Sequence, residues 1–131
     1  MTVLDTSVVI DYLLGSDAGP PVEALFRDEG AAAAPDLLVF EVLAVLRRAA
    51  ARDELPTTRA DAAIADLGDM AVDLFPTLPL RERAWELRHN MTAADGIFVA
   101  LAEALDEPFA TKDAGLARAV QRHATIQVRV L

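Results

Sequence analysis

Residues 2–15 read Thr2-Val3-Leu4-Asp5-Thr6-Ser7-Val8-Val9-Ile10-Asp11-Tyr12-Leu13-Leu14-Gly15. The apolar run that ends at Asp5 predicts a short strand. Apolar residues then recur at helical spacing through residues 6–14, and Gly15 ends the pattern, which predicts a helix. The chain therefore begins with a strand that leads directly into a helix, and an acidic residue stands at their junction.

The alternation of strands and helices continues to the end of the chain. Further strands are predicted at residues 31–34, 72–78, 108–111 and 126–130, and helices at 21–28, 35–52, 57–70, 80–89, 92–105 and 114–122. Strands that alternate with helices favour a parallel sheet with helices on both faces. We therefore expect an α/β fold with a central parallel sheet of about five strands, in one domain that spans residues 1–131.

Composition limits the classes of function. Hydrophobic residues make up 53% of the chain, which is enough for a sizeable core, and there is no cysteine for a disulfide or a thiolate metal site. The first residues lack the basic region of a signal peptide, and no apolar stretch is long enough to span a bilayer, so we expect a cytoplasmic protein. The net charge of −9 argues against generic nucleic-acid binding. It leaves open a nucleic-acid enzyme whose carboxylates are masked by metal.

Four acidic residues stand within or beside hydrophobic runs: Asp5, Glu41, Asp95 and Asp113. A charge beside buried surface is costly unless another group compensates it. In parallel sheets the carboxyl ends of strands and the starts of the following helices share one edge, where ligands bind. A divalent cation at that edge could compensate all four carboxylates at once.

Each of these acids also has a purely structural interpretation. Asp5 and Asp113 are placed to cap the helices that follow them, and Asp95 could be the acidic half of a capping box with Thr92. For Glu41 the best structural alternative is a buried arginine partner. These alternatives stay open at the level of sequence.

Glu41 fits a solvated helix face poorly, because its helical neighbours at positions 37, 38, 44 and 45 are all apolar. A buried glutamate without a partner costs several kcal/mol or takes up a proton. Asp36 is the expected cap of the same helix and leaves Glu41 unexplained. The acids at residues 61, 66, 69 and 73 are at exposed spacing and are interpreted as solvated.

The chemistry that these residue types favour is metal-assisted phosphodiester cleavage. Carboxylates without histidine or cysteine form an oxygen-only site that suits Mg²⁺ or Mn²⁺. Hydroxyls at positions 6, 7 and 111 could orient the carboxylates or a water, although Ser7 is more simply a helix-start residue. His89 and His123 are expected at the surface, so no Ser-His-Asp triad is supported. No glycine-rich phosphate loop is present.

Four motifs in order resemble the PIN-domain family, most of all the VapC-type toxins of bacterial toxin–antitoxin pairs. The motifs are Val3-Leu4-Asp5-Thr6-Ser7, Pro35-Asp36-Leu37-Leu38-Val39-Phe40-Glu41-Val42, Thr92-Ala93-Ala94-Asp95-Gly96-Ile97-Phe98-Val99-Ala100-Leu101-Ala102 and Ala110-Thr111-Lys112-Asp113-Ala114-Gly115-Leu116. The resemblance implies a PIN-like fold and a metal-dependent endoribonuclease that cleaves RNA with a metal-activated water. It also implies a cognate antitoxin and a homodimer.

The resemblance assigns roles to particular residues. Asp5, Glu41, Asp95 and Asp113 match the acidic site of the family, and Thr111 matches its hydroxyl. Asp5, Asp95 and Asp113 would hold a Mg²⁺ or Mn²⁺ ion, and Glu41 would orient or deprotonate the attacking water.

One departure from the family pattern concerns Asp95. Many relatives carry an aromatic residue before this acid and alanine after it, where this chain has Ala94 and Gly96. Glycine lowers helix propensity by about 1 kcal/mol relative to alanine, so we expect a looser turn at Asp95.

Two other classes of protein compete with the nuclease. A phosphorelay receiver domain needs two acidic residues side by side near the first strand, but the neighbours of Asp5 are Leu4 and Thr6. A non-catalytic module could use the same acids to bind arginines of a partner.

Overall fold

Five parallel strands form the centre of the computed structural model, which describes residues 1–131. They are β1 (Val3–Leu4), β2 (Ala32–Pro35), β3 (Val72–Phe75), β4 (Phe109–Thr111) and β5 (Val128–Val130). The strand order across the sheet is β3-β2-β1-β4-β5, and all four neighbouring pairs are parallel. The predicted parallel α/β sheet is therefore confirmed.

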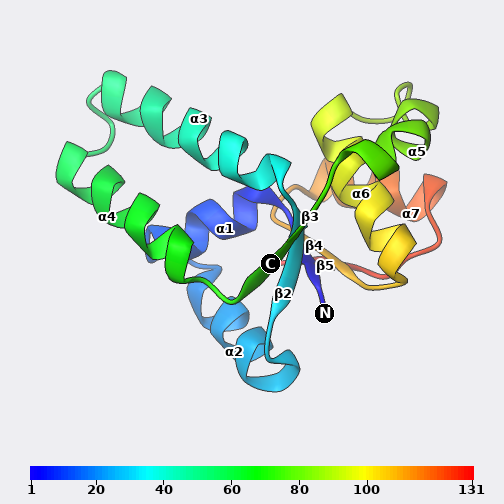
Figure 1. Ribbon diagram of the computed structural model, residues 1–131, viewed down its shortest axis with the longest axis horizontal. Coiled ribbons are helices and arrows are strands. Elements are labelled where there is room, and N and C mark those ends of the chain that lie inside the picture. The colour runs from blue at the N-terminus through cyan, green and yellow to red at the C-terminus, as the bar shows by residue number, and fades with distance from the viewer.

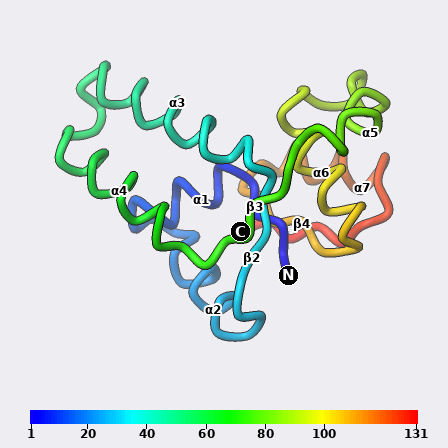
Figure 2. The backbone as a smooth tube through the Cα atoms, in the orientation of Figure 1, coloured from blue at the N-terminus to red at the C-terminus, as the bar shows by residue number.

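Helices cover both faces of this sheet. They are α1 (Thr6–Leu13), α2 (Gly19–Glu29), α3 (Leu37–Ala51), α4 (Thr57–Asp69), the 3₁₀ helix η1 (Leu78–Leu80), α5 (Arg81–Glu86), α6 (Ala93–Leu105) and α7 (Ala114–His123). Figure 1 shows α1 to α4 on one side of the sheet and α5 to α7 on the other, and the backbone trace in Figure 2 has the same two groups. None of these helices is long and apolar enough to cross a membrane.

The chain reverses its direction of travel across the sheet next to β1. After β1 it moves outward to β2 and β3, and it then returns to the other side of β1 to form β4 and β5. This reversal places a topological switch point between β1 and β4. In sheets of this kind, ligands bind at the switch point, outside the carboxyl ends of the strands. The residues that follow β1 and β4 therefore lie beside each other, although more than a hundred positions separate them.

The core is built from small side chains in the sheet and larger ones in the helices. Residues 32–34, the three alanines of β2, are fully buried, and α6 packs against both β1 and β2. Phe98 of α6 and Phe109 of β4 are the largest fully buried side chains. The small alanine side chains of β2 let α6 approach the sheet closely. This packing explains why alanine, a poor strand former, occupies the strand.

Proline accounts for two boundaries that differ from the predictions. Helix α2 begins at Gly19, earlier than the predicted residue 21, because Pro20 and Pro21 occupy its first turn, where their missing N–H groups cost nothing. Strand β3 ends at Phe75 and not at residue 78, and Pro76, which has no N–H for the ladder, follows it directly.

Helix α4 packs less deeply than its sequence pattern indicated. Its buried residues are Ala60 and Ala63, whereas the larger apolar side chain of Ile64 is exposed. The expectation of solvated acids on and after this helix is confirmed for residues 61, 66, 69 and 73.

Gly96 marks a close approach of α6 to α5, a role that the expected looser turn at Asp95 did not include. A Cβ at this position would lie 3.2 Å from the carbonyl oxygen of Ala84 and 3.4 Å from its Cα. These are backbone atoms of a packed helix, which cannot turn aside as a flexible side chain would.

Matched glycine-to-alanine substitutions test this packing. Gly68 lies in α4 with open space around it, so Gly68→Ala should raise the free energy of unfolding by about 0.5–1 kcal/mol through helix propensity. Gly96→Ala should bring no such gain, because the added methyl group strains the contact with α5. Urea denaturation of both variants measures the difference, and equal stabilisation would contradict the packing explanation.

Candidate active site

Asp5 lies at the junction of β1 and α1, and its carboxylate is almost completely enclosed. The side chain is 7% exposed and caps α1, since the Thr6 backbone N–H donates to Oδ1 at 2.8 Å. Two hydroxyls donate to the other oxygen: Ser7 Oγ at 2.9 Å and Thr111 Oγ1 at 2.7 Å from Oδ2. The capping interpretation is thus confirmed, but it accounts for only one of the two carboxylate oxygens.

Thr111 joins the ends of the two strands at the switch point. Its hydroxyl is buried, donates to Asp5 and accepts the backbone N–H of Asp113 at 3.0 Å. Asp113 is exposed and caps α7, because its Oδ1 accepts the Leu116 N–H at 3.0 Å. The structural interpretation of Asp113 is confirmed as well, and its second oxygen makes no hydrogen bond within the chain.

Glu41 is half-buried and has a hydroxyl partner, not an arginine. The Thr6 hydroxyl donates to Glu41 Oε1 at 2.7 Å, and no ion pair involves this glutamate, so the buried-arginine alternative is wrong. Asp36 stands at the start of α3, but its helical backbone angles leave its side chain without a capping bond, contrary to expectation. Thr6 therefore connects the Asp5 region of α1 to the glutamate of α3.

Asp95 lies in the first turn of α6, where its backbone N–H donates to Thr92 Oγ1 at 3.1 Å. Burial is the main cause that raises its pKa from 3.8 to about 6. The hydrogen bond with Thr92 opposes this shift, whereas the charges of Asp5, Glu41 and Asp113 add to it. The four predicted acids therefore share one electrostatic environment, although they come from β1, from helices on both sides of the sheet and from the start of α7.

The carboxylates are neighbours, but they are not assembled around a common point. No three acidic or histidine side chains lie close enough together to hold one metal ion directly. The donor set is nevertheless entirely oxygen and carries several negative charges, and none of the four acids forms an ion pair with a basic residue. That set fits Mg²⁺, which keeps several of its waters and uses only one or two protein carboxylates directly.

Sequence reasoning missed a pair that borders this site. Lys112 Nζ lies 2.8 Å from Asp11 Oδ2, and the same oxygen accepts the Ala18 N–H at 2.7 Å. Burial raises the pKa of Asp11, but the hydrogen bonds and charge of these partners outweigh it and leave the pKa below its usual value. The sequence offered one signal for this pair, namely that Lys112 is the only lysine in the chain.

Ser7 does more than begin a helix. Besides donating to Asp5, its hydroxyl accepts the Lys112 backbone N–H at 3.3 Å, which fixes the loop after β4 against α1. His89 and His123 are exposed, as expected.

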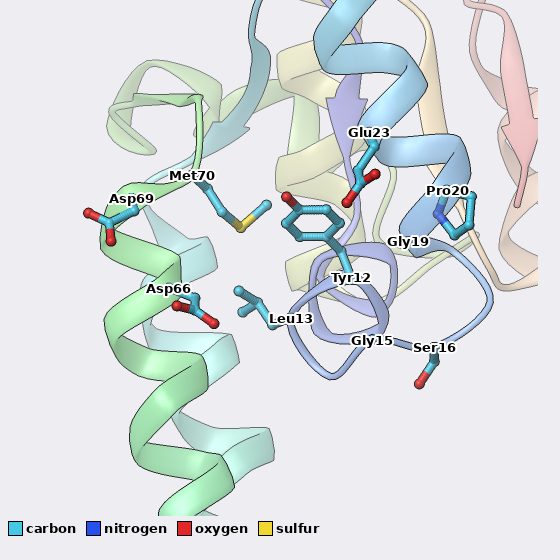
Figure 3. A pocket seen from close by; sticks show the side chains of 10 residues that line it. All are labelled: Tyr12, Leu13, Gly15, Ser16, Gly19, Pro20, Glu23, Asp66, Asp69 and Met70. Atoms are coloured by element: carbon cyan, nitrogen blue, oxygen red, sulfur yellow. The ribbon is translucent and has the colours of Figure 1, made fainter.

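The largest cavity lies elsewhere and is lined by none of the four acids. It has a volume of about 470 Å³ between the end of α1, the start of α2 and the end of α4. Figure 3 shows Tyr12 between Glu23 on one side and Asp66 and Asp69 on the other. The candidate active site instead lies at the switch point, and none of its four acids lines any of the four cavities.

Comparison with known proteins assigns this architecture to a family. The PIN domain family model matches residues 2–121. Ribonuclease VapC1 of Mycobacterium tuberculosis is 42% identical over 118 residues, which cover 89% of each chain. Ribonuclease VapC12 of the same species is 33% identical over 128 residues, which cover 98% of each chain.

A solved structure supports the fold. The chain superposes on a structure of VapBC2 from Rickettsia felis bound to a DNA fragment from its promoter, with a TM-score of 0.72 at 11% sequence identity, over 98% of this chain and 97% of that one. This chain belongs to the PIN domain family, and the relatives that it matches over most of their length are VapC ribonucleases.

Proposed function

We propose that this protein is a metal-dependent endoribonuclease that acts as the toxin of a toxin–antitoxin pair. The observation that carries the proposal is the convergence of Asp5, Glu41, Asp95 and Asp113 at the carboxyl edge of the sheet, where their charges act together on the pKa of Asp95. The similarity to VapC ribonucleases supports RNA as the substrate. An RNA target favours action in the cytoplasm.

The proposed ligands of Mg²⁺ or Mn²⁺ are Asp5, Asp95 and Asp113, partly through water. A bound divalent ion would neutralise the rim, activate water and stabilise charge on the phosphate that is attacked. Thr111 and Ser7 hold the Asp5 carboxylate in one orientation through their hydroxyl groups. Glu41, oriented by Thr6, is placed to position the attacking water and to accept its proton.

Metal removal gives the direct test. Purified chain without any partner should cleave total RNA when Mg²⁺ or Mn²⁺ is present and stop when EDTA is in excess, because no bound metal ion is then available to activate water. Sequencing of the fragment ends then identifies the cut sites. Cleavage that persists in excess chelator, or RNA that stays intact with either metal, would refute the proposal.

Proposed partners are a cognate antitoxin and a second copy of the chain. Apolar side chains remain exposed on α3, α4 and β3, among them Phe40, Leu43, Ile64 and Leu74. Part of this surface forms a groove of about 370 Å³. An exposed apolar surface of this kind suits a protein partner. The homodimer remains a prediction, and sedimentation of the free chain measures it.

The alternative is a non-catalytic binding module. Metal-dependent cleavage of RNA by the free chain would exclude this alternative. The receiver-domain alternative has no support in the comparisons, which match the PIN domain over residues 2–121.

A further inference from the structure

Trp85 is the only tryptophan of the chain, and it projects from α5 with 68% of its surface exposed. The guanidinium carbon of Arg88 lies 4.5 Å from the centroid of the indole ring, within the range of a cation–π contact. Arg88 Nη1 also donates to the Trp85 carbonyl oxygen at 2.9 Å, which holds the guanidinium in place. The guanidinium covers one face of the indole ring, and the two side chains form an aromatic and cationic stack that is organised before any ligand arrives. The free faces of this stack are the other face of the indole and the outer face of the guanidinium.

This surface lies beside the start of α6, the helix that carries Asp95. Trp85 and Arg88 line a hollow of about 370 Å³ together with Arg81 and with Thr92 and Ala93 at the start of α6. Thr92 is the residue whose hydroxyl accepts the N–H of Asp95. The first turn of α6 thus borders the hollow and carries one of the four acids, and Figure 1 shows α5 beside α6. Asp95 is half a turn away from Ala93 and Ile97, so its side chain and the hollow lie on opposite sides of the start of α6.

The charges around the hollow suit a polyanion. The chain carries a net charge of −9, yet two arginines, Arg81 and Arg88, line this hollow and no acid does. Arg81 has one ion-pair contact, a long 3.9 Å distance to exposed Glu82, which binds it weakly. Arg83, on the same helix, is fully engaged with Glu86, Glu103 and the His123 carbonyl group.

We propose that Trp85 and Arg88 form a stacking platform for an unpaired base of single-stranded RNA whose strand continues past the start of α6 to the candidate active site. This inference rests on the proposed ribonuclease function and names how the substrate is held. Aromatic side chains beside cationic residues bind single strands in this way, because every base has a π-face and every nucleotide a phosphate. Bases paired in a duplex are already stacked, so the platform favours unpaired substrate.

The single tryptophan allows a direct measurement. Fluorescence of the full chain in EDTA, titrated with an eight-nucleotide single-stranded RNA of mixed sequence, should fall as a base stacks on Trp85. The same RNA annealed to its complement should leave the emission unchanged. Because no cleavage occurs in EDTA, this titration tests the platform even if the chain proves not to be a nuclease.

Substitutions separate stacking from general apolar contact. Trp85→Leu should weaken single-stranded RNA binding, measured by anisotropy of labelled RNA, by about 5- to 100-fold, the range expected for the loss of one stacked base. Trp85→Phe should retain most of the affinity. In cleavage assays with Mg²⁺, Trp85→Leu should raise KM and leave kcat nearly unchanged. Val130→Ala, at an exposed apolar position on β5, serves as the control and should match the wild type.

Three results would overturn the inference. Emission that does not respond to single-stranded RNA would show that no base reaches Trp85. Equal affinity of Trp85→Leu and wild-type chains would show the same. If Trp85→Leu disrupts self-association in sedimentation while RNA binding is unaffected, this surface is a protein interface instead.

Discussion

Asp5→Asn should lower RNA cleavage at least about a hundredfold and leave the chain folded. Substitutions that only disturb the partners of a metal ligand typically cost 10- to 100-fold, and loss of a proposed ligand should cost at least as much. The fold should persist because asparagine retains an oxygen that can accept the Thr6 N–H, while the hydroxyls of Ser7 and Thr111 can turn to accept from its amide group. We expect a stability change within about 1 kcal/mol.

Two further variants make this experiment specific. Thr111→Val keeps the shape of the side chain but removes the hydroxyl that orients Asp5, so cleavage should fall by about 10- to 100-fold. Asp61→Asn removes one negative charge from an exposed position of α4 and should leave cleavage unchanged. Initial rates with Mg²⁺ and circular dichroism report activity and folding. Full activity of Asp5→Asn would remove the central ligand from the proposed mechanism.

Asp95→Asn should abolish cleavage and, in the metal-free protein, raise stability at neutral pH. The pKa of Asp95 is about 6 in the folded chain and 3.8 in the reference state. A carboxyl whose pKa is raised by folding binds its proton more tightly in the native state. The native state therefore loses stability as pH rises from about 4 to about 6, and the loss persists above pH 6. The expected gain for asparagine at pH 7.5 is about 1–3 kcal/mol.

Urea denaturation in EDTA at pH 7.5 and at pH 4 measures this effect. The gain should be present at pH 7.5 and nearly absent at pH 4, where both chains carry a neutral group. Asp11→Asn provides a control of opposite sign, because the pKa of Asp11 is lowered in the folded chain. That carboxylate contributes stability above its unfolded pKa, so its loss should destabilise the protein at pH 7.5. If Asp95→Asn is instead less stable than the wild type at neutral pH, ionisation of Asp95 does not destabilise the folded chain.

Much of the architecture followed from local pattern. Helical and strand periodicity predicted the order of the strands and α-helices but not η1. The rule that ligands bind at the carboxyl ends of parallel strands predicted that Asp5 and Asp113 lie at one edge of the sheet. Boundaries were wrong where proline decided them, as at Pro20 and Pro76. Helix capping, predicted from the sequence, accounts for one carboxylate oxygen of Asp5 and one of Asp113. It was predictable because a cap depends only on residues within one turn of the helix.

The partners of the site residues could not be predicted in the same way. The hydroxyl of Thr111 reaches Asp5 across 106 positions, and that of Thr6 reaches Glu41 across 35. The sequence marked Glu41 as an anomaly, but it suggested an arginine where the structure has a threonine.

By itself, the sequence determined the alternation of elements, the acidic junctions and the family to which they belong, since these depend on periodicity and on residues close together in the chain. Only the tertiary structure decided that Gly96 fits against Ala84, that Asp11 pairs with Lys112 and that Trp85 borders the start of α6. These features depend on how helices pack across distances that no local pattern encodes. Burial and mutual repulsion, which raise the pKa of Asp95, likewise exist only once the sheet has brought the acids together.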